Sequence, residues 1–358
     1  MTTRSSRKLP TGTRLPASLL EIRRLFDVLD WTTMARQVEE ETLARVAIVG
    51  PVNSGKSTLF NRLKGHQVSP VAAVPGTTRE LLSEHWGPFS LIDTPGFGEV
   101  DGVDRAGIAL AGIEQANVIV LVLDAIAGVR QTDYALLQRL RATGKPVVVA
   151  LNKIDLLDKD REMVLIDARE KLAEPGVIPI SAKKGTNVAR LLLPQMVDAH
   201  PALAVAIGRA LPSYRQQACR KVIRNASLLN AAIGAEPIPG LDIPFLLASQ
   251  VRLVLRIAAI YGEPMSAQHA RELIATIAGG VALRYVAGEG AKLVPGAGWV
   301  VAAAVAGAGT WAIGQVALQY FEHDKKLTSE QLQALYKRAH HRRRPEAGEG
   351  SPAGETGA

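Results

Sequence analysis

Runs of valine, isoleucine and leucine alternate with helical stretches between Ala44 and about His200, and this alternation narrows the choice of fold more than any other feature. Near-continuous apolar runs are typical of parallel strands that are covered on both faces. Alternation with helices places such strands in a doubly wound sheet. The runs are Val46–Gly50, Leu91–Thr94, Val118–Asp124, Val147–Asn152 and Val177–Ser181. The sequence therefore predicts an α/β domain with a mostly parallel sheet over 44–200.

The rest of the chain predicts helices and polar ends, with no further strand pattern. Ser18 and Glu21 have the spacing of a capping box, and apolar residues follow them at helical intervals. The lone Cys219 excludes an internal disulfide framework and a multi-cysteine metal site. We expect a disordered basic arm over 1–15, an amphipathic helix over 16–43, a helical linker over 201–240, an all-α domain over 241–335 and a disordered tail over 336–358.

A phosphate-binding loop follows the first apolar run. The segment Gly50–Ser57 fits the pattern G-x-x-x-x-G-K-[ST], and it stands between a predicted strand and a predicted helix, as this motif requires. Gly50 and Gly55 let backbone amides point at phosphate oxygens, Lys56 would neutralise phosphate charge, and Ser57 would bind Mg²⁺. The motif assigns nucleotide contacts to Gly50, Asn53, Ser54, Gly55, Lys56, Ser57 and Thr58.

Three short motifs at the ends of later strands point to guanine as the base. In Asp93–Gly96 the carboxylate can hold Mg²⁺ through water and the Gly96 amide can meet a γ-phosphate. In Asn152–Asp155 the Asp155 carboxylate can accept from guanine N1 and N2, while Lys153 can pack over the base. In Ser181–Lys183 the Ala182 amide can donate to guanine O6. Each motif alone could be a strand-end cap, but their order along one sheet edge favours a site for GTP and GDP.

The stretch from about Ala44 to His200 resembles the Era/TrmE/Der group of bacterial GTPases. The resemblance depends on Asn53 inside the phosphate loop and on the segment Gly76–Arg79. It implies that Thr78, with Thr77 as the alternative, meets Mg²⁺ and the γ-phosphate, so that Mg²⁺ is held by Ser57, Thr78 and Asp93. It also implies catalytic roles for Asn53, Lys56, Thr78 and Gly96, with Asn53 helping to hold a K⁺ ion; the alternative for Asn53 is a hydrogen bond that stabilises the loop.

Phe97 follows Gly96 where Ras-like GTPases have a glutamine that orients the attacking water. A phenylalanine cannot orient water, and the resembling group also carries a hydrophobic residue there. The sequence therefore predicts a Mg²⁺-dependent GTPase with slow intrinsic hydrolysis. A scaffold that binds GTP and barely hydrolyses it is a further possibility.

A charge-free stretch over Leu293–Phe321 explains why the mean hydropathy is positive, at +0.10, although 21% of residues are charged. Its length would suit a bilayer span, and its glycines and alanines would let helices approach closely. The alternative is a buried Ala/Gly helical hairpin within the all-α domain. The segment Asp242–Phe321 resembles the YcjF-type domain of unknown function, which occurs with Era-like GTPase domains and implies a membrane location.

The net charge of +8 is concentrated outside the predicted nucleotide site. Basic residues cluster in the arm, in the segment after Ser213, and at Arg342–Arg344. We expect a cytoplasmic GTPase switch attached to the inner membrane, either to its surface or to a membrane protein. The alternative is an Era-like assembly factor that binds RNA or the ribosome through these clusters. The sequence leaves the oligomeric state open.

Overall fold

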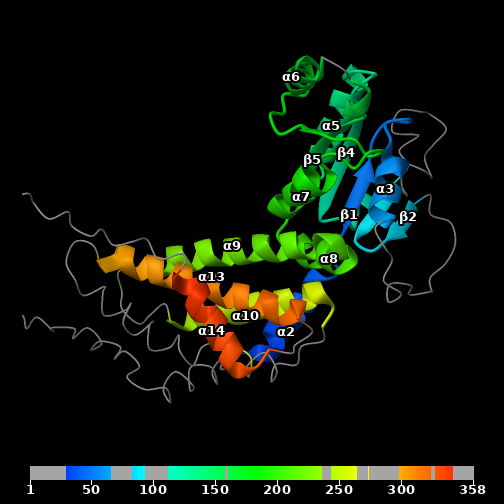
Figure 1. The fold of residues 1–358 in the computed structure, drawn as a ribbon. Helices are drawn as coiled ribbons and strands as arrows, with labels where there is room; N and C mark the ends of the chain where they lie inside the picture. Colours follow the sequence, from blue (N-terminus) through cyan, green and yellow to red (C-terminus); the bar gives the residue numbers. More distant parts are fainter. Residues whose placement is uncertain are drawn as a thin grey trace, which may run out of the picture. The chain divides into compact units, whose positions relative to one another are not determined.

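The computed structural model describes residues 30–65, 83–92, 112–157, 160–235, 243–263, 273, 298–323 and 327–341 (Figure 1). The chain divides into two compact units. The sheet unit comprises Thr33–Val222 and Arg256–Pro264, and the helical unit comprises the remaining residues. The predicted basic arm, the Ser18–Glu21 capping box and residues 342–358 of the predicted tail lie outside the described residues. The prediction of a disordered tail from residue 336 is wrong at its start, because 336–341 form the end of a helix that spans Ser329–His341.

The sheet unit is built on a six-stranded sheet with the strand order β2-β3-β1-β4-β5-β6. Only β2 runs antiparallel to its neighbour, and every other pair is parallel. The predicted α/β fold with a mostly parallel sheet is therefore confirmed. The strands are β1 Val46–Val49, β2 Ser83–Trp86, β3 Phe89–Ile92, β4 Val118–Asp124, β5 Val147–Asn152 and β6 Ile178–Pro179.

Strand β2 is the one described strand that the hydrophobic pattern does not predict. Its sequence Ser-Glu-His-Trp contains no apolar run, because it is an edge strand that pairs only with β3 among the described residues. A tight turn containing Gly87, whose φ is +54°, joins the two strands. Edge strands need not be apolar on both faces. A search for the continuous apolar runs of buried parallel strands therefore does not detect them.

Helices connect the parallel strands and cover the sheet. Alternate strand residues such as Ala47, Val49 and Leu121 join residues of α5 and α6 in one buried cluster. Helices α3 and α7 also contact the sheet, through strands that include β1 and β4. The helices are α3 Lys56–Lys64, α5 Gln131–Arg141, α6 Arg161–Leu172 and α7 Leu193–Ala199, with a short helix η2 at Ile154–Leu156 and a π-helical turn η3 at Val188–Leu192.

Further helices pack within the sheet unit beyond the sheet itself. They are α2 Trp31–Glu41, from Thr33 onward, α8 Leu203–Ala210, the turn η4 Pro212–Tyr214, the start of α9 Arg215–Gly234 and the end of α10 Ile243–Tyr261. Arg256 of α10 forms an ion pair with Glu41 of α2 at 2.6 Å, and it also donates to the carbonyl of Pro201 at 2.8 Å. Helix α2 confirms the last part of the predicted N-terminal helix.

The helical unit contains the rest of α9 and α10, with α13 Gly298–Glu322 and α14 Ser329–His341. Small residues let α13 lie directly against α9. A Cβ added to Gly234 would lie 2.7 Å from Ala306 Cβ, and one added to Gly314 would lie 2.6 Å from Ile223 Cγ1. The glycines and alanines of this stretch therefore serve close helix packing, as the sequence predicts.

A buried polar cluster fixes the position of α13 within the helical unit. Thr310 is fully buried, and its hydroxyl accepts hydrogen bonds from Asn230 Nδ2 at 2.7 Å and Gln250 Nε2 at 3.2 Å. By length and composition, Val300–Glu322 is the one helix of the described chain that could cross a membrane, but 56% of its most apolar window is buried inside the protein. In this structure α13 is the core helix of the unit, which agrees with the buried alternative rather than with a bilayer span.

Candidate functional site

The phosphate loop between β1 and α3 has the backbone that its motif requires. Gly50 and Gly55 have φ values of +149° and +92°, and neither position leaves space for a side chain. A Cβ on Gly50 would lie 2.2 Å from Val122 O, and a Cβ on Gly55 would lie 2.2 Å from Asn152 Nδ2. Asn53 adopts a left-handed φ of 65°, which asparagine tolerates better than most residues, and its side chain is exposed.

Lys56, Ser57 and Thr58 begin α3 directly after this loop. The Lys56 side chain is only 8% exposed, and its Nζ donates to Pro51 O at 3.0 Å, so the lysine folds back over the loop. Ser57 and Thr58 are exposed on the first turn. The Ser57 hydroxyl is a hard oxygen ligand of the kind that Mg²⁺ prefers. Thr78, Asp93 and Gly96, the other residues predicted to contact Mg²⁺ or the γ-phosphate, lie outside the described residues.

Asn152, at the end of β5, ties the phosphate loop to the Ser181–Lys183 loop. Its Nδ2 donates to Ser54 O at 2.9 Å, and its Oδ1 accepts from the Ala182 amide, also at 2.9 Å. The side chain is 2% exposed, and the Ser54 side chain is fully buried. Asn152 therefore acts as a buried bridge between two loops far apart in sequence, and any contact of Ser54 with a nucleotide would come from its backbone.

Lys153 has a left-handed backbone, with φ of 69°, and its ammonium group pairs with Asp124 Oδ2 at 2.7 Å. Asp124 ends β4 next to Asn152 in the sheet register. The pair holds the lysine stem along the carboxyl edge of the sheet, where it can cover a base. Asp124 is a site residue that the sequence reasoning missed, although its position at the end of an apolar run was a usable signal.

Asp155 lies in η2, immediately after this turn, and is partly exposed. A hydrogen bond from the Ser181 hydroxyl lowers the pKa of the Asp155 carboxyl, with smaller contributions from Lys183 and Lys184. The Ser181 oxygen in turn accepts from the Lys184 amide at 3.0 Å. The carboxylate is therefore ionised at neutral pH and oriented from the neighbouring loop, as an acceptor for two guanine donors must be.

The Ser181–Lys183 loop differs in one detail from the expectation. The Ala182 amide, the predicted donor to guanine O6, is directed at Asn152 Oδ1 in the structure, and Ala182 is 1% exposed. Lys183 is exposed. The structure thus brings together Gly50–Thr58, Asn152–Asp155 and Ser181–Lys183, while the base contact of Ala182 stays a prediction.

Several known proteins are similar to this chain. GTPase Der from Desulforudis audaxviator is 37% identical over 208 residues, which are 56% of this chain and 46% of that protein. GTPase Der from Escherichia coli (O7:K1) is 41% identical over 167 residues, which are 44% of this chain and 34% of that protein. The chain thus spans less than half the length of these relatives. Among solved structures, a variant of Aquifex aeolicus Era bound to GDP and AlF₄⁻ has a TM-score of 0.35 and 27% identity, covering 52% of this chain and 66% of that one.

Two family models match separate parts of the chain. Residues 45–153 match the family described as 50S ribosome-binding GTPase, and they include the phosphate loop and the first two residues of the Asn152–Asp155 motif. Residues 201–345 match DUF697, a domain of unknown function. Both resemblances that the sequence motifs indicate are confirmed. The chain is therefore similar to the 50S ribosome-binding GTPase family over 45–153 and to DUF697 over 201–345.

Proposed function

We propose that this protein is a guanine-nucleotide switch that hydrolyses GTP to GDP and phosphate. The observation that carries the proposal is the Asn152 bridge, which joins the phosphate loop to the base-recognition loop in one site. Phosphate binding and guanine selection then depend on a single buried side chain. When GTP replaces GDP, new contacts of the γ-phosphate would reorganise the segments around Thr78 and Gly96.

Mg²⁺ fits the donors that this chain offers. Ser57 supplies a hydroxyl from α3. Thr78 and Asp93 would supply oxygens from the segments Gly76–Arg79 and Asp93–Gly96. When bound, the ion would neutralise charge on the β- and γ-phosphates. The Lys56 ammonium group, which donates to the Pro51 carbonyl in this structure, would add its positive charge to the same phosphates. With Phe97 in place of a glutamine, the chain supplies no side chain at that position to orient water.

We expect GTP hydrolysis to be faster in KCl than in NaCl, because the exposed Asn53 side chain is free to join a K⁺ site beside the phosphates. Asn53→Gly should remove the difference between the salts, since glycine accepts the left-handed φ and lacks only the amide. The measurement is phosphate release under single turnover in each salt. Lys56→Ala serves as the inactive control. Equal rates for the wild-type protein in both salts would eliminate the K⁺ site.

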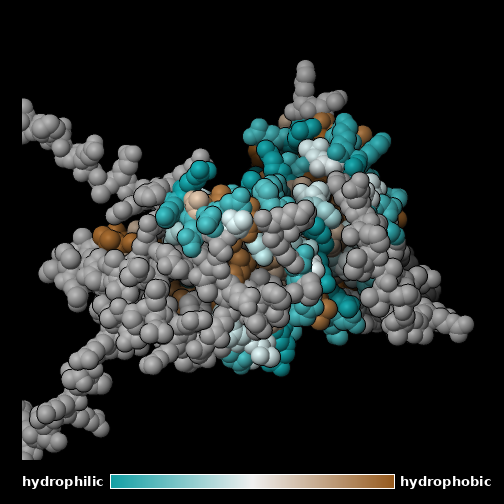
Figure 2. Space-filling model, turned by 60° about the horizontal axis from the view of Figure 1, so that its bottom comes forward, coloured by the Kyte–Doolittle hydropathy of each residue, from teal (hydrophilic) through white to brown (hydrophobic). Residues whose placement is uncertain are grey.

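The helical unit is the proposed membrane-attachment part. Exposed apolar side chains lie in the second half of α9 and in the first turns of α10 and α13, and Figure 2 shows some hydrophobic surface on the helices. These side chains are Leu228, Leu229, Phe245, Val300 and Val301. On α9, exposed Arg220 and Arg224 precede Leu228 at intervals of four residues, so basic and apolar groups share one helix face. Such a face suits the interface of an anionic membrane.

This arrangement supports peripheral attachment at the cytoplasmic face of the inner membrane. The buried Thr310 cluster holds α13 inside the helical unit, and a bilayer span would require Asn230 and Gln250 to give up that partner. Shallow insertion of the exposed apolar side chains requires no such loss. We therefore propose that the protein lies on the membrane.

We expect the protein to sediment with vesicles of phosphatidylglycerol and phosphatidylethanolamine, and not with phosphatidylcholine alone. The double change Leu228→Ser and Leu229→Ser should weaken vesicle binding at least roughly tenfold, because burial of each leucine contributes about 1.5–3 kcal/mol. The matched control is Leu156→Ser with Met163→Ser, which removes exposed apolar residues of the sheet unit instead. Wild-type protein that stays in the supernatant with anionic vesicles would refute membrane attachment.

A ribosome- or RNA-associated assembly factor is the second candidate function, favoured by the description of the matching GTPase family. The basic cluster after Ser213 supports it only in part. Lys221 is 9% exposed and bonded to Asp198 and to the Pro194 carbonyl, while Arg215 stacks over Tyr261 at 5.7 Å. Only Arg220 and Arg224 of the four basic residues are exposed. Co-sedimentation with ribosomes that falls steeply with salt would favour this candidate.

A further inference from the structure

Arg62, near the end of α3, reaches across to the loop that follows β6. Its Nε donates to Ala182 O at 3.1 Å, and its Nη2 donates to Lys183 O. One guanidinium group thus holds two consecutive carbonyls of the Ser181–Lys183 loop, which is proposed to recognise the base. Because the side chain is planar and its donors are arranged as a fork, it can restrain both peptide groups together.

The hydrogen bond from Arg62 to the Ala182 carbonyl also fixes the orientation of the Lys183 amide. In a trans peptide the C=O and the following N–H point in opposite directions. Holding Ala182 O toward Arg62 therefore turns the Lys183 N–H away from α3. The Ala182 N–H is already engaged with Asn152, whereas the Lys183 N–H has no partner within the described part of the chain. The amide available to guanine O6 is thus the one that Arg62 orients.

The hydrogen bond from Arg62 to the Lys183 carbonyl influences the Asp155 carboxylate in a similar way. It fixes the peptide that contains the Lys184 N–H, and this group donates to Ser181 Oγ at 3.0 Å. The Ser181 hydroxyl is then directed to donate to Asp155. The second hydrogen bond of Arg62 therefore supports the acceptor for guanine N1 and N2.

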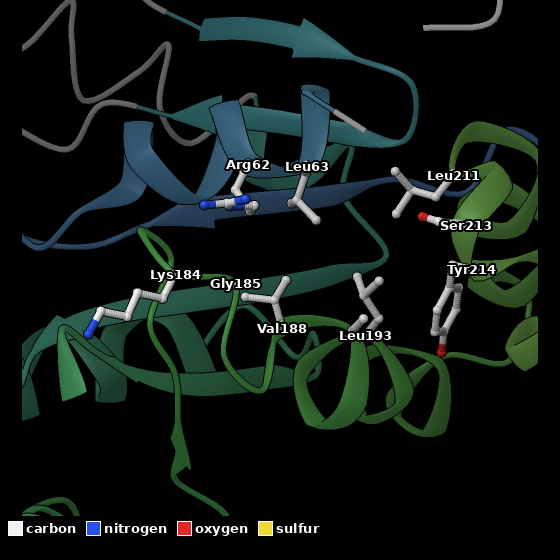
Figure 3. Close-up of a pocket in the computed structure, with 10 residues that line it drawn as sticks. Arg62, Leu63, Lys184, Gly185, Val188, Leu193, Leu211, Ser213 and Tyr214 are labelled. Atoms are coloured by element: carbon white, nitrogen blue, oxygen red, sulfur yellow. The ribbon is translucent and has the colours of Figure 1, made fainter. Parts of the chain in front are cut away.

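One side of the loop that follows β6 faces a cavity instead of packed side chains. A cavity of about 200 Å³ lies against the same loop, and Arg62, Leu63, Lys184, Gly185 and Val188 are among its lining residues (Figure 3). Gly185 has a left-handed φ of +76°, and its backbone lies beside the Arg62 stem. Because open space lies next to Lys184 and Gly185, hydrogen bonds hold this side of the loop, whereas Ser181 and Ala182 are buried.

We propose that Arg62 is a positioning residue for guanine recognition, which sets the Lys183 amide against O6 and steadies Asp155 through Ser181. The inference rests on the proposed binding of guanine nucleotide and adds a determinant outside the recognised motifs. It predicts that base selectivity depends on a helix that otherwise serves the phosphates. Arg62 thus links helix α3, which follows the phosphate loop, to the Ser181–Lys183 loop. This link is independent of Asn152.

The test compares GDP with 6-thio-GDP, which keeps N1–H and the 2-amino group but replaces O6 with a weaker acceptor. Arg62→Ala should weaken GDP binding roughly 30-fold, the effect of losing two hydrogen bonds of about 1 kcal/mol each. It should also lower the ratio of GDP to 6-thio-GDP affinity, because a misplaced amide no longer distinguishes the two. A merely structural role would weaken both nucleotides alike. Affinities are measured by calorimetry with the full chain.

Arg62→Lys should give an intermediate ratio, since lysine can satisfy one carbonyl but not both. The matched control is Arg190→Ala, which removes an exposed arginine from the π-helical turn after the loop and should leave the ratio unchanged. An unchanged ratio in Arg62→Ala overturns the inference, and if that variant does not fold, an unchanged ratio in Arg62→Lys does so. Wild-type protein that fails to bind GDP would instead refute the proposed function.

Discussion

Replacing Asp155 with asparagine is expected to exchange the base preference of the protein from guanine to xanthine. The ionised carboxylate can accept from both guanine N1–H and the 2-amino group. Asparagine presents one donor and one acceptor, which match the 2-oxo group and N1–H of xanthine. With GDP, the variant loses one charge-assisted hydrogen bond, and the asparagine amide donor faces the donating 2-amino group of guanine. Together these changes should reduce the binding free energy by about 3 kcal/mol, so that GDP affinity falls roughly 100-fold.

Calorimetric titration of GDP and XDP into both proteins measures this exchange. Because the Ser181 hydrogen bond lowers the pKa of Asp155, the wild-type carboxylate stays charged well below neutral pH, and the comparison can be made at pH 7. The control is Asp160→Asn, an exposed aspartate just before α6 that should leave both affinities unchanged. If Asp155→Asn retains the wild-type preference for GDP over XDP, the assignment of the base site is wrong.

Replacing Asn152 with alanine is expected to destabilise the sheet unit and to abolish tight nucleotide binding together. The change leaves the buried Ser54 carbonyl and the buried Ala182 amide without the partners that they have at 2.9 Å. Two orphaned polar groups and a small cavity should cost about 3 kcal/mol of unfolding free energy. The midpoint of urea unfolding monitored by circular dichroism gives the loss of stability, and calorimetry gives the loss of binding.

The matched control is Asn117→Ala at the start of β4, where the side chain accepts one hydrogen bond from the Arg45 amide at 2.8 Å and is only partly buried. That change should cost at most about 1 kcal/mol, because water can replace the lost partner. Similar unfolding midpoints for the two variants would show that Asn152 is not the bridge that the distances indicate.

The amino-acid pattern was a strong guide wherever one physical requirement acts on a continuous segment. A buried parallel strand must be apolar on both faces, so β4 and β5 could be located to the residue. A tight phosphate loop requires glycine, and the 2.2 Å approaches at Gly50 and Gly55 show why no other residue fits. The edge strand β2 escaped the pattern because its polar residues meet no such requirement.

The sequence alone determined the fold class and the phosphate loop, and it predicted the residues that would read guanine, because those properties depend on local spacing and on residue chemistry. Only the tertiary structure decided how the motifs are joined, through Asn152 to Ser54 and Ala182, and through Arg62 to the same loop. It also decided what α13 packs against within the helical unit, because the partners of Thr310 come from α9 and α10 and no local pattern records contacts between segments so far apart in the chain.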